Sequence, residues 1–544
     1  TLGSASHGHS LGNTYNGFIS GTYTRPFGAL TTRTTVRALF ERSDDTGTSA
    51  SGSDLAVIDV PDLDVAINQS IGSSFSEVRA NAYLAQVGLD WNGKYILDVL
   101  GRRDESSLFG PDARVNDYYR VAGSWRMAQE SWWPFASITE FKLRGAQGTA
   151  GGRPNFSDQY ETWSVSVSGD GTTSVGKGSL GNTNLKPEFS TERDFGVDMI
   201  VNDKYSLQLS YITNKTEDLI LAVPLPAVTG YSTQVVNTGT MEGTTYEATF
   251  EAQLVNQADF SWNMSVVADR SRSEILDWNR SCYSSGLRYY CDNAGMGAMW
   301  AFQHVKNIEN LPASLQSMSD EFDVNDDGYL VWVGAGNSWK DGVSKNLWGT
   351  QMVDPQTGRA YDWGIPFLKT DSLDIVTYEQ VGRSEPDLGW GWMNNVRYKG
   401  FNLHLHLQGQ IGGNVYNEGR QRTYFELKGA EQDQFGKSDE TKKPFNYYTR
   451  IYNGYDYTRD FVEPGWYLKL RTVSLTYALG PSVLEPLRLA GLSQIDLGLI
   501  MRNAYTWTDF KGWDPEAGSV LNRIESEGVF PKMRQITGYV EITF

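Results

Sequence analysis

The last ten residues of the chain alternate between two kinds of side chain and end on an aromatic residue, Phe544. Successive side chains of a β-strand point to opposite faces, so this period of two predicts a strand with one apolar and one polar face. The apolar face carries Ile536, Gly538, Val540 and Ile542, and the polar face carries Thr537, Tyr539, Glu541 and Thr543. Such a strand suits a barrel in an outer membrane, where the lipid side must be apolar and no edge can stay unpaired in hydrocarbon.

The composition is compatible with such a barrel and argues against two other classes of protein. The 544 residues contain no apolar run of about 18 residues, the length that a transmembrane helix needs. The mean hydropathy of -0.43 does not exclude membrane-crossing strands, because alternating residues average out. The 29 Tyr, 23 Phe and 17 Trp residues are typical of aromatic girdles at a membrane surface. A net charge of -18 argues against nucleic acid as a partner.

Period-two segments bounded by turn residues recur along the chain and predict fifteen strands. The fold class that we expect is all-β, a transmembrane antiparallel β-barrel with long extracellular loops. The strands are expected near 15–25, 31–42, 80–91, 94–103, 117–127, 138–147, 191–201, 204–215, 243–255, 259–270, 389–399, 401–412, 466–479, 492–502 and 533–543.

The connections between these strands alternate between shorter and longer. The shorter ones are 26–30, 92–93, 128–137, 202–203, 256–258, 400 and 480–491. The longer ones are 43–79, 104–116, 148–190, 216–242, 271–388, 413–465 and 503–532. Tight turns on one side and long loops on the other are typical of bacterial outer-membrane barrels, whose long loops are extracellular. A soluble β-sandwich has no reason to place every long connection on one side.

Four segments in order along the chain resemble motifs of the SusC/RagA family of TonB-dependent outer-membrane transporters. Segment 93–111 (GKYIL…GRRDESSLFGP) resembles "GKYLL…RRDGSSRFGP", and segment 180–188 (LGNTNLKPE) resembles "NPNLKPE". Segment 461–471 (FVEPGWYLKLR) resembles "YVEDGSFLKLRN", and segment 502–516 (RNAYTWTDFKGWDPE) resembles "RNLFTWTDYKGFDPE". Each match is modest alone, but four in the family's order identify the chain as similar to this family over most of its length.

The resemblance also implies parts that precede this chain. Family members have a TonB box, a small carboxypeptidase-like domain and a plug before a barrel of about 22 strands. We therefore interpret residues 1–544 as the C-terminal two-thirds of such a barrel, with the plug and N-terminal domain absent and about seven strands, an odd number, supplied elsewhere. The chain starts at Thr1 without a signal peptide, so we expect targeting to be encoded upstream.

Two functions remain open. The resemblance implies import of oligosaccharides or peptides through the bacterial outer membrane, with a SusD-like surface lipoprotein over the loops and TonB acting through the plug. The alternative is a passive pore or a structural subunit of a surface assembly. An enzyme is not expected, since the sequence shows no nucleophile–base or paired-acid arrangement. The substrate-binding residues cannot be assigned from the sequence.

Segment 323–329 (DVNDDGY) matches the first half of a calcium loop. Side-chain oxygens of Asp323, Asn325 and Asp327 can converge because a glycine follows, and the Tyr329 carbonyl can add a fourth ligand. The acid expected at position 12 of an EF-hand is replaced by Gly334, so a complete EF-hand is excluded. Calcium, the only cofactor considered, and an acidic Asx-type turn both stay open.

Several remaining features are informative at the residue level. Cys282 and Cys291 are nine residues apart, and an even count at short spacing in an exported protein predicts a disulfide. His404 and His406 share one face of a strand and are interpreted as polar lining of the barrel lumen rather than a metal site. Aromatic residues recur in the longest loop and indicate either internal packing or sugar capture: Trp278, Tyr283, Tyr289, Tyr290, Trp300, Trp332, Trp339, Trp348 and Trp363.

Overall fold

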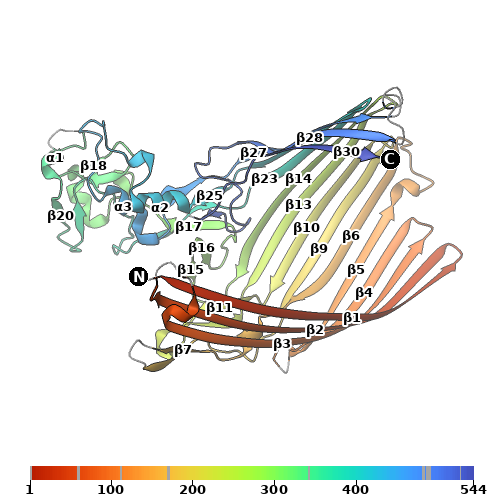
Figure 1. Cartoon of the computed structure of the whole chain (residues 1–544), viewed down its shortest axis with the longest axis horizontal. Coiled ribbons are helices and arrows are strands. Elements are labelled where there is room, and N and C mark those ends of the chain that lie inside the picture. Colours follow the sequence, from red (N-terminus) through yellow and green to blue (C-terminus); the bar gives the residue numbers. More distant parts are fainter. Residues whose placement is uncertain are drawn as a thin grey trace. The chain divides into compact units, whose positions relative to one another are not determined.

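The computed structural model describes residues 3–57, 60, 62–110, 113–167, 172–340, 344–480, 484, 492–526 and 528–544. One antiparallel sheet of fifteen strands runs through it in the order β1-β2-β3-β4-β5-β6-β9-β10-β13-β14-β23-β24-β27-β28-β30 (Figure 1). None of the helices in these residues combines the length and the apolar character that crossing a membrane requires.

The bounds of the sheet strands are as follows: β1 Ser4–Phe27, β2 Leu30–Leu55, β3 Ala66–Trp91, β4 Tyr95–Ser106, β5 Val115–Arg126, β6 Ile138–Gly152, β9 Glu188–Val201, β10 Tyr205–Glu217, β13 Thr240–Asn256, β14 Phe260–Asp277, β23 Leu388–Tyr398, β24 Phe401–Ile411, β27 Tyr467–Leu479, β28 Gln494–Trp507 and β30 Gln535–Thr543. All fifteen predicted strands are confirmed. The predicted alternation of short and long connections is wrong at one place, because the connection 127–137 between β5 and β6 is longer than the preceding connection 107–114. Most of the connection 480–491 lies outside the described residues.

The first three strands are much longer than the sequence pattern predicted. β2 continues to Leu55 and β3 begins at Ala66, so most of the predicted connection 43–79 is strand. β1 begins at Ser4 and pairs with β2 over its full length, so it starts well before the predicted strand 15–25. Serine, threonine and glycine are frequent in these extensions, and the apolar residues Ile67, Ile71 and Phe75 of β3 recur only at every fourth position. Backbone pairing therefore continues where the period-two hydropathy signal has weakened.

The chain divides into two compact units. Unit 1 comprises residues 1–203, 208–244 and 276–280, and unit 2 comprises 204–207, 245–275 and 281–544. The long connections of unit 1 carry two short hairpins, β7–β8 (Trp163–Val167, Thr173–Lys177) and β11–β12 (Ile220–Pro224, Thr233–Asn237). A side chain on Gly110 would overlap the Thr183 carbonyl oxygen, so only glycine permits this close approach between segments 93–111 and 180–188.

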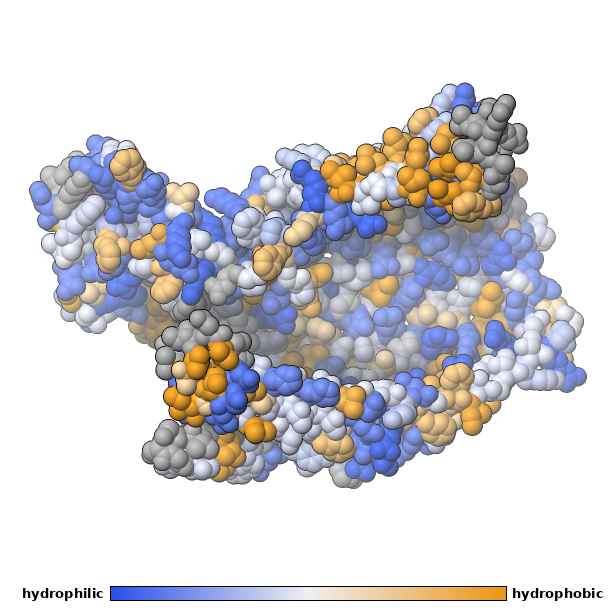
Figure 2. Space-filling view, viewed as in Figure 1, coloured by the Kyte–Doolittle hydropathy of each residue, from blue (hydrophilic) through white to orange (hydrophobic). Residues whose placement is uncertain are grey.

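The sheet strands of unit 2 have one apolar and one polar face. Cross-strand neighbours on the apolar face include Val396, Leu403, Leu405, Val473, Leu475, Leu497, Leu499, Met501, Ile536 and Val540. Neighbours on the other face include Asn395, Arg397, Asn402, His404, Ser474 and Thr476, which line a hollow of about 440 Å³. Figure 2 shows hydrophobic residues gathered over β28 and β30, where Leu499 and Val540 are 55% and 63% exposed. An exposed apolar face of this kind fits contact with lipid.

The long connections of unit 2 carry short elements of their own (Figure 1). The strands are β15 Tyr283–Ser285, β16 Arg288–Tyr290, β17 Ala298–Phe302, β18 Phe322–Val324, β19 Leu330–Trp332, β20 Gln351–Val353, β21 Ala360–Asp362, β22 Tyr378–Arg383, β25 Asn414–Asn417, β26 Val462–Pro464 and β29 Ile524–Glu525. The α-helices are α1 Ser344–Leu347, α2 Glu418–Glu426 and α3 Tyr447–Tyr452.

The connection between β14 and β23 packs against the connection between β24 and β27. One hydrophobic cluster contains Leu287, Met299 and Ile365 from the former and Tyr416, Tyr447 and Phe461 from the latter. Trp339 and Trp363 are each 2% exposed and stack with ring centroids 5.3 Å apart. For these two tryptophans, internal packing rather than sugar capture is the observed role.

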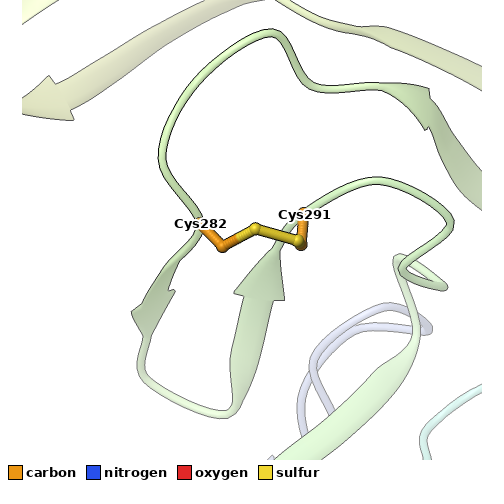
Figure 3. The surroundings of a disulfide bond; sticks show 2 residues. All are labelled: Cys282 and Cys291. Atoms are coloured by element: carbon orange, nitrogen blue, oxygen red, sulfur yellow. A yellow bond between two sulfur atoms is a disulfide. The ribbon is translucent and has the colours of Figure 1, made fainter.

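The disulfide predicted from the sequence is present. Cys282 and Cys291 flank the β15–β16 hairpin with their Cα atoms 4.8 Å apart (Figure 3). The rings of Tyr283 and Tyr290 stack across the same hairpin with centroids 5.1 Å apart. The cross-link therefore pins a small hairpin within the longest connection.

We expect mass spectrometry of unreduced peptides to find Cys282 joined to Cys291. Closing so short a loop should contribute about 2 kcal/mol of local order in the chain-entropy model. Reduction should therefore accelerate amide hydrogen exchange in the β15–β16 hairpin, while the β18–β19 hairpin, which has no cysteine, stays unchanged. Two free thiols in the native protein would contradict this prediction.

Candidate functional site

Two of the segments that carry the family resemblance meet at the start of β27. Segment 461–471 supplies β26 and the first residues of β27, and segment 502–516 begins in β28 and continues beyond its end. β26 pairs with β25, which in turn pairs in parallel with β29. This three-stranded sheet joins the connection after β24 to the connection after β28.

A cluster of opposite charges fastens the two segments together. The Glu516 carboxylate accepts hydrogen bonds from Lys469 at 2.6 Å, from Lys532 at 2.8 Å and from Arg471. Lys469 also donates to Asp514 at 2.5 Å, and its side chain is only 5% exposed. Burial alone raises the pKa of Glu516, but hydrogen bonds from Arg471, Lys469 and Lys532 outweigh it and hold that pKa well below its usual range.

The buried guanidinium of Arg523 adds a second set of contacts beside this charge cluster. We call the region around Arg523 and Glu525 the base of the site. Arg523 donates to the carbonyl oxygen of Gly465 at 3.0 Å, to that of Ser384 at 3.5 Å and to that of Pro515. Arg523 is 4% exposed, and burial lowers the pKa of its guanidinium. Because carbonyl oxygens of three separate segments share one cation, the base holds these segments in a single arrangement.

The carboxylate of Glu525 holds the backbone at an exposed tryptophan. Glu525 is 1% exposed and accepts hydrogen bonds from the backbone N–H groups of Trp513 at 3.0 Å and Asp514 at 2.7 Å. Burial raises the pKa of Glu525. Trp513 itself is 71% exposed. The backbone at this position is therefore held by two hydrogen bonds while the indole ring stays available at the surface.

Trp513 lies at the edge of a pocket of about 1020 Å³. The pocket is lined by Asn417, Gly419, Arg420, Arg422, Thr423, Glu426, Ala430, Glu431, Lys511, Gly512, Trp513, Glu525, Ser526 and Gly528. Helix α2 forms one wall, and the end of segment 502–516 forms another. A concave site with a few polar groups and an aromatic surface has the properties of a ligand site.

Most charges in the pocket are paired. The guanidinium of Arg420 forms a two-pronged contact with Glu431, both N–O distances being 2.9 Å, and reaches Glu463 at 3.3 Å. Arg422 lies 3.6 Å from Glu426. Because the charges cancel in pairs, the pocket offers hydrogen-bond donors, acceptors and an aromatic face rather than a strong field of one sign.

The segment expected to bind calcium forms the turn of the β18–β19 hairpin. Asp323, Asn325, Asp327 and Tyr329 lie together, but their oxygens already accept hydrogen bonds from groups of the protein. The described residues include no group of three or more His, Cys, Asp or Glu side chains with the geometry of a metal site. The hydrogen bond from the Asp327 N–H to the Asn325 side-chain oxygen forms an Asx-type turn, the alternative that the sequence left open, and calcium binding stays a prediction.

His404 and His406 are on the polar face of β24, as predicted. His404 Nδ1 lies 2.7 Å from Asn395 Oδ1 on the adjacent strand. This contact supports the interpretation of the pair as polar lining.

The sequence pattern did not predict the pocket beside Trp513. Its residues come from separate connections whose meeting is not visible in local spacing. One signal was available, since the cations Lys469 and Arg471 alternate with Leu468 and Leu470 in one segment and the acids Asp514 and Glu516 end the other. Buried charges need partners, so these two pairs could have been matched.

Comparisons with known proteins agree with this architecture. A family model described as TonB dependent receptor-like, beta-barrel matches residues 2–297. TonB-dependent receptor P3 of Formosa agariphila is 27% identical over 504 residues, which cover 88% of this chain and 47% of that protein. TonB-dependent receptor SusC of Bacteroides thetaiotaomicron is 25% identical over 206 residues, or 36% of this chain and 20% of that protein. The chain thus spans about half the length of the Formosa relatives that it matches.

The fold is also similar to that of a solved transporter. A structure titled as the RagAB peptide transporter superposes with a TM-score of 0.72 at 16% identity, covering 99% of this chain and 56% of that one. At this identity the likeness is one of fold. Since the family model matches more than half of the chain, the chain belongs to the TonB dependent receptor-like, beta-barrel family.

Proposed function

We propose that this chain forms barrel strands and outer loops of an energised importer in the bacterial outer membrane, with the long loops extracellular. The observation that carries the proposal is the family match over residues 2–297, together with the RagAB-like fold. The cargo is an oligosaccharide or a peptide. The partners are a SusD-like surface lipoprotein and TonB, which acts through a plug outside residues 1–544. The proposed function assigns no catalytic step to this chain.

An uptake assay separates this function from that of a passive pore. Cells that carry the full-length gene, and cells that lack it, are given fluorescently labelled oligosaccharides and peptides. Energised import predicts gene-dependent uptake that stops when an uncoupler collapses the proton gradient. Uptake that depends on the gene but persists with the uncoupler would support the passive alternative instead.

The pocket beside Trp513 is proposed as a contact site for the cargo. Sugar rings and peptide side chains both present apolar faces that stack on an indole, and the paired charges around Arg420 can exchange hydrogen bonds with hydroxyl or amide groups. The base formed by Arg523 and Glu525 supports this proposal, since a prearranged site loses less entropy when it binds.

Replacing Trp513 with alanine should weaken binding of the imported ligand about tenfold, the equivalent of one lost stacking contact. Titration calorimetry with the ligand found in the uptake assay measures the change. The matched control is Phe435→Ala, which removes another aromatic residue that is 94% exposed but does not line the pocket. Equal affinity of the Trp513 variant and the unchanged protein would remove this pocket from the import route.

A further inference from the structure

In the turn of the β18–β19 hairpin, each potential calcium ligand accepts a hydrogen bond from a group of the protein. The Asn325 side-chain oxygen accepts from the backbone N–H groups of Asp327 and Tyr329, each at 3.0 Å. The Tyr329 carbonyl accepts from the Asn325 N–H at 2.9 Å. The Asp323 carboxylate accepts from the N–H of Val324 at 2.8 Å. Each of these bonds uses one acceptor position of its oxygen, and a carbonyl or carboxylate oxygen has a second, so the charge that faces the turn decides whether an ion can bind.

The remaining two acids face a lysine from another connection. The ammonium of Lys443 contacts Asp326 directly and lies 3.3 Å from Asp327. The Lys443 side chain is 2% exposed, whereas those of Asp326 and Asp327 are 34% and 40% exposed. A buried ammonium is costly unless carboxylates neutralise it, so this lysine depends on the two acids.

Aromatic rings complete the surroundings of the ammonium. The Lys443 nitrogen lies 5.0 Å from the ring centroid of Trp339 and 5.3 Å from that of Tyr447. The Tyr447 hydroxyl donates to Asp327 at 2.8 Å and accepts from the Asn325 side chain at 2.8 Å. Burial raises the pKa of Tyr447, which keeps this hydroxyl protonated and able to donate.

We propose that the ammonium of Lys443 takes the place of the metal ion in this loop, so that the DVNDDG segment is independent of calcium and joins two loops of the protein. Lys443 and Asp326 are 117 residues apart in sequence. The contact therefore ties the connection between β14 and β23 to that between β24 and β27. A calcium ion added beside Lys443 would meet like charge at close range and would have to displace the lysine.

The experiment combines two variants with terbium as the probe, because Tb³⁺ occupies calcium sites and is excited by nearby Trp or Tyr rings. In the full-length protein, sensitised luminescence should be the same for the unchanged chain and for Asp327→Asn. Lys443→Ala should gain luminescence that excess calcium removes. Luminescence in the unchanged protein that Asp327→Asn abolishes would overturn the proposal, as would a Lys443→Ala variant without any gain.

Lys443→Met tests the tie between the loops separately, since it keeps most of the apolar stem and removes the charge. Amide hydrogen exchange in 325–329 should accelerate by about tenfold or more. The control is Lys442→Met, because Lys442 is the adjacent lysine, pairs with Asp439 at 3.1 Å and does not contact the turn acids in the described contacts. Unchanged exchange in the Lys443 variant would show that the lysine does not hold the loop, and this result is independent of whether the protein transports anything.

Discussion

Replacing Glu516 with glutamine should lower the free energy of unfolding of the full-length protein by about 3 kcal/mol, because Lys469 and Arg471 would lose the carboxylate that neutralises them. Breaking a buried ion pair costs about 3–5 kcal/mol of stability, and the lower end of this range applies because the Glu516 side chain is 16% exposed. Denaturant titration in phospholipid vesicles measures the effect. The control is Glu440→Gln, because Glu440 is an exposed acid in the same unit. This substitution should change the free energy of unfolding by no more than about 0.5 kcal/mol.

The difference in the free energy of unfolding between the Glu516→Gln variant and the unchanged protein should become smaller at acidic pH. The pKa of Glu516 is lowered in the folded state, so its contribution is fully present above the unfolded pKa of about 4.3 and is lost as the pH falls toward the folded value. The difference between the two proteins should therefore be constant from about pH 6 upward and smaller at about pH 3. A difference that grows in acid would contradict the assignment of Glu516 as the charged partner.

The substitution Leu405→Arg should lower the free energy of unfolding by about 2–4 kcal/mol if Leu405 lies near the middle of the membrane. Leu405 is between Asn394 and Val473 on the apolar face of the sheet. The same vesicle titration applies. His404→Arg is the matched control, because this position is adjacent in sequence but on the polar face, and its cost should stay within about 1 kcal/mol. Equal costs at both positions would contradict the assignment of the two faces.

The local sequence pattern was sufficient for the strands and the disulfide. The period of two along β24 and β30 is a property of neighbouring residues, so it could be recognised without any knowledge of their partners. The cross-link between Cys282 and Cys291 was predictable because their spacing is short. The length of β1 to β3 was not predictable from hydropathy, because serine, threonine and glycine interrupt the alternation.

The four family segments gained their meaning only in three dimensions. Gly110 of the first approaches Thr183 of the second, and Lys469 of the third is neutralised by Glu516 of the fourth. The sequence showed that these segments occur and in which order. It did not show that they form two contact pairs, and therefore it did not show the pocket that the second pair supports.

By itself, the sequence determined the all-β class and the fifteen strands of the sheet, because both follow from interactions between near neighbours. The tertiary structure decided the pocket beside Trp513 and the partner of the DVNDDG turn. Lys443 reaches that turn from 117 residues away, and local spacing cannot distinguish an acid that awaits a metal from an acid that already faces a lysine. Long-range packing makes that distinction, because it determines which charges are buried together.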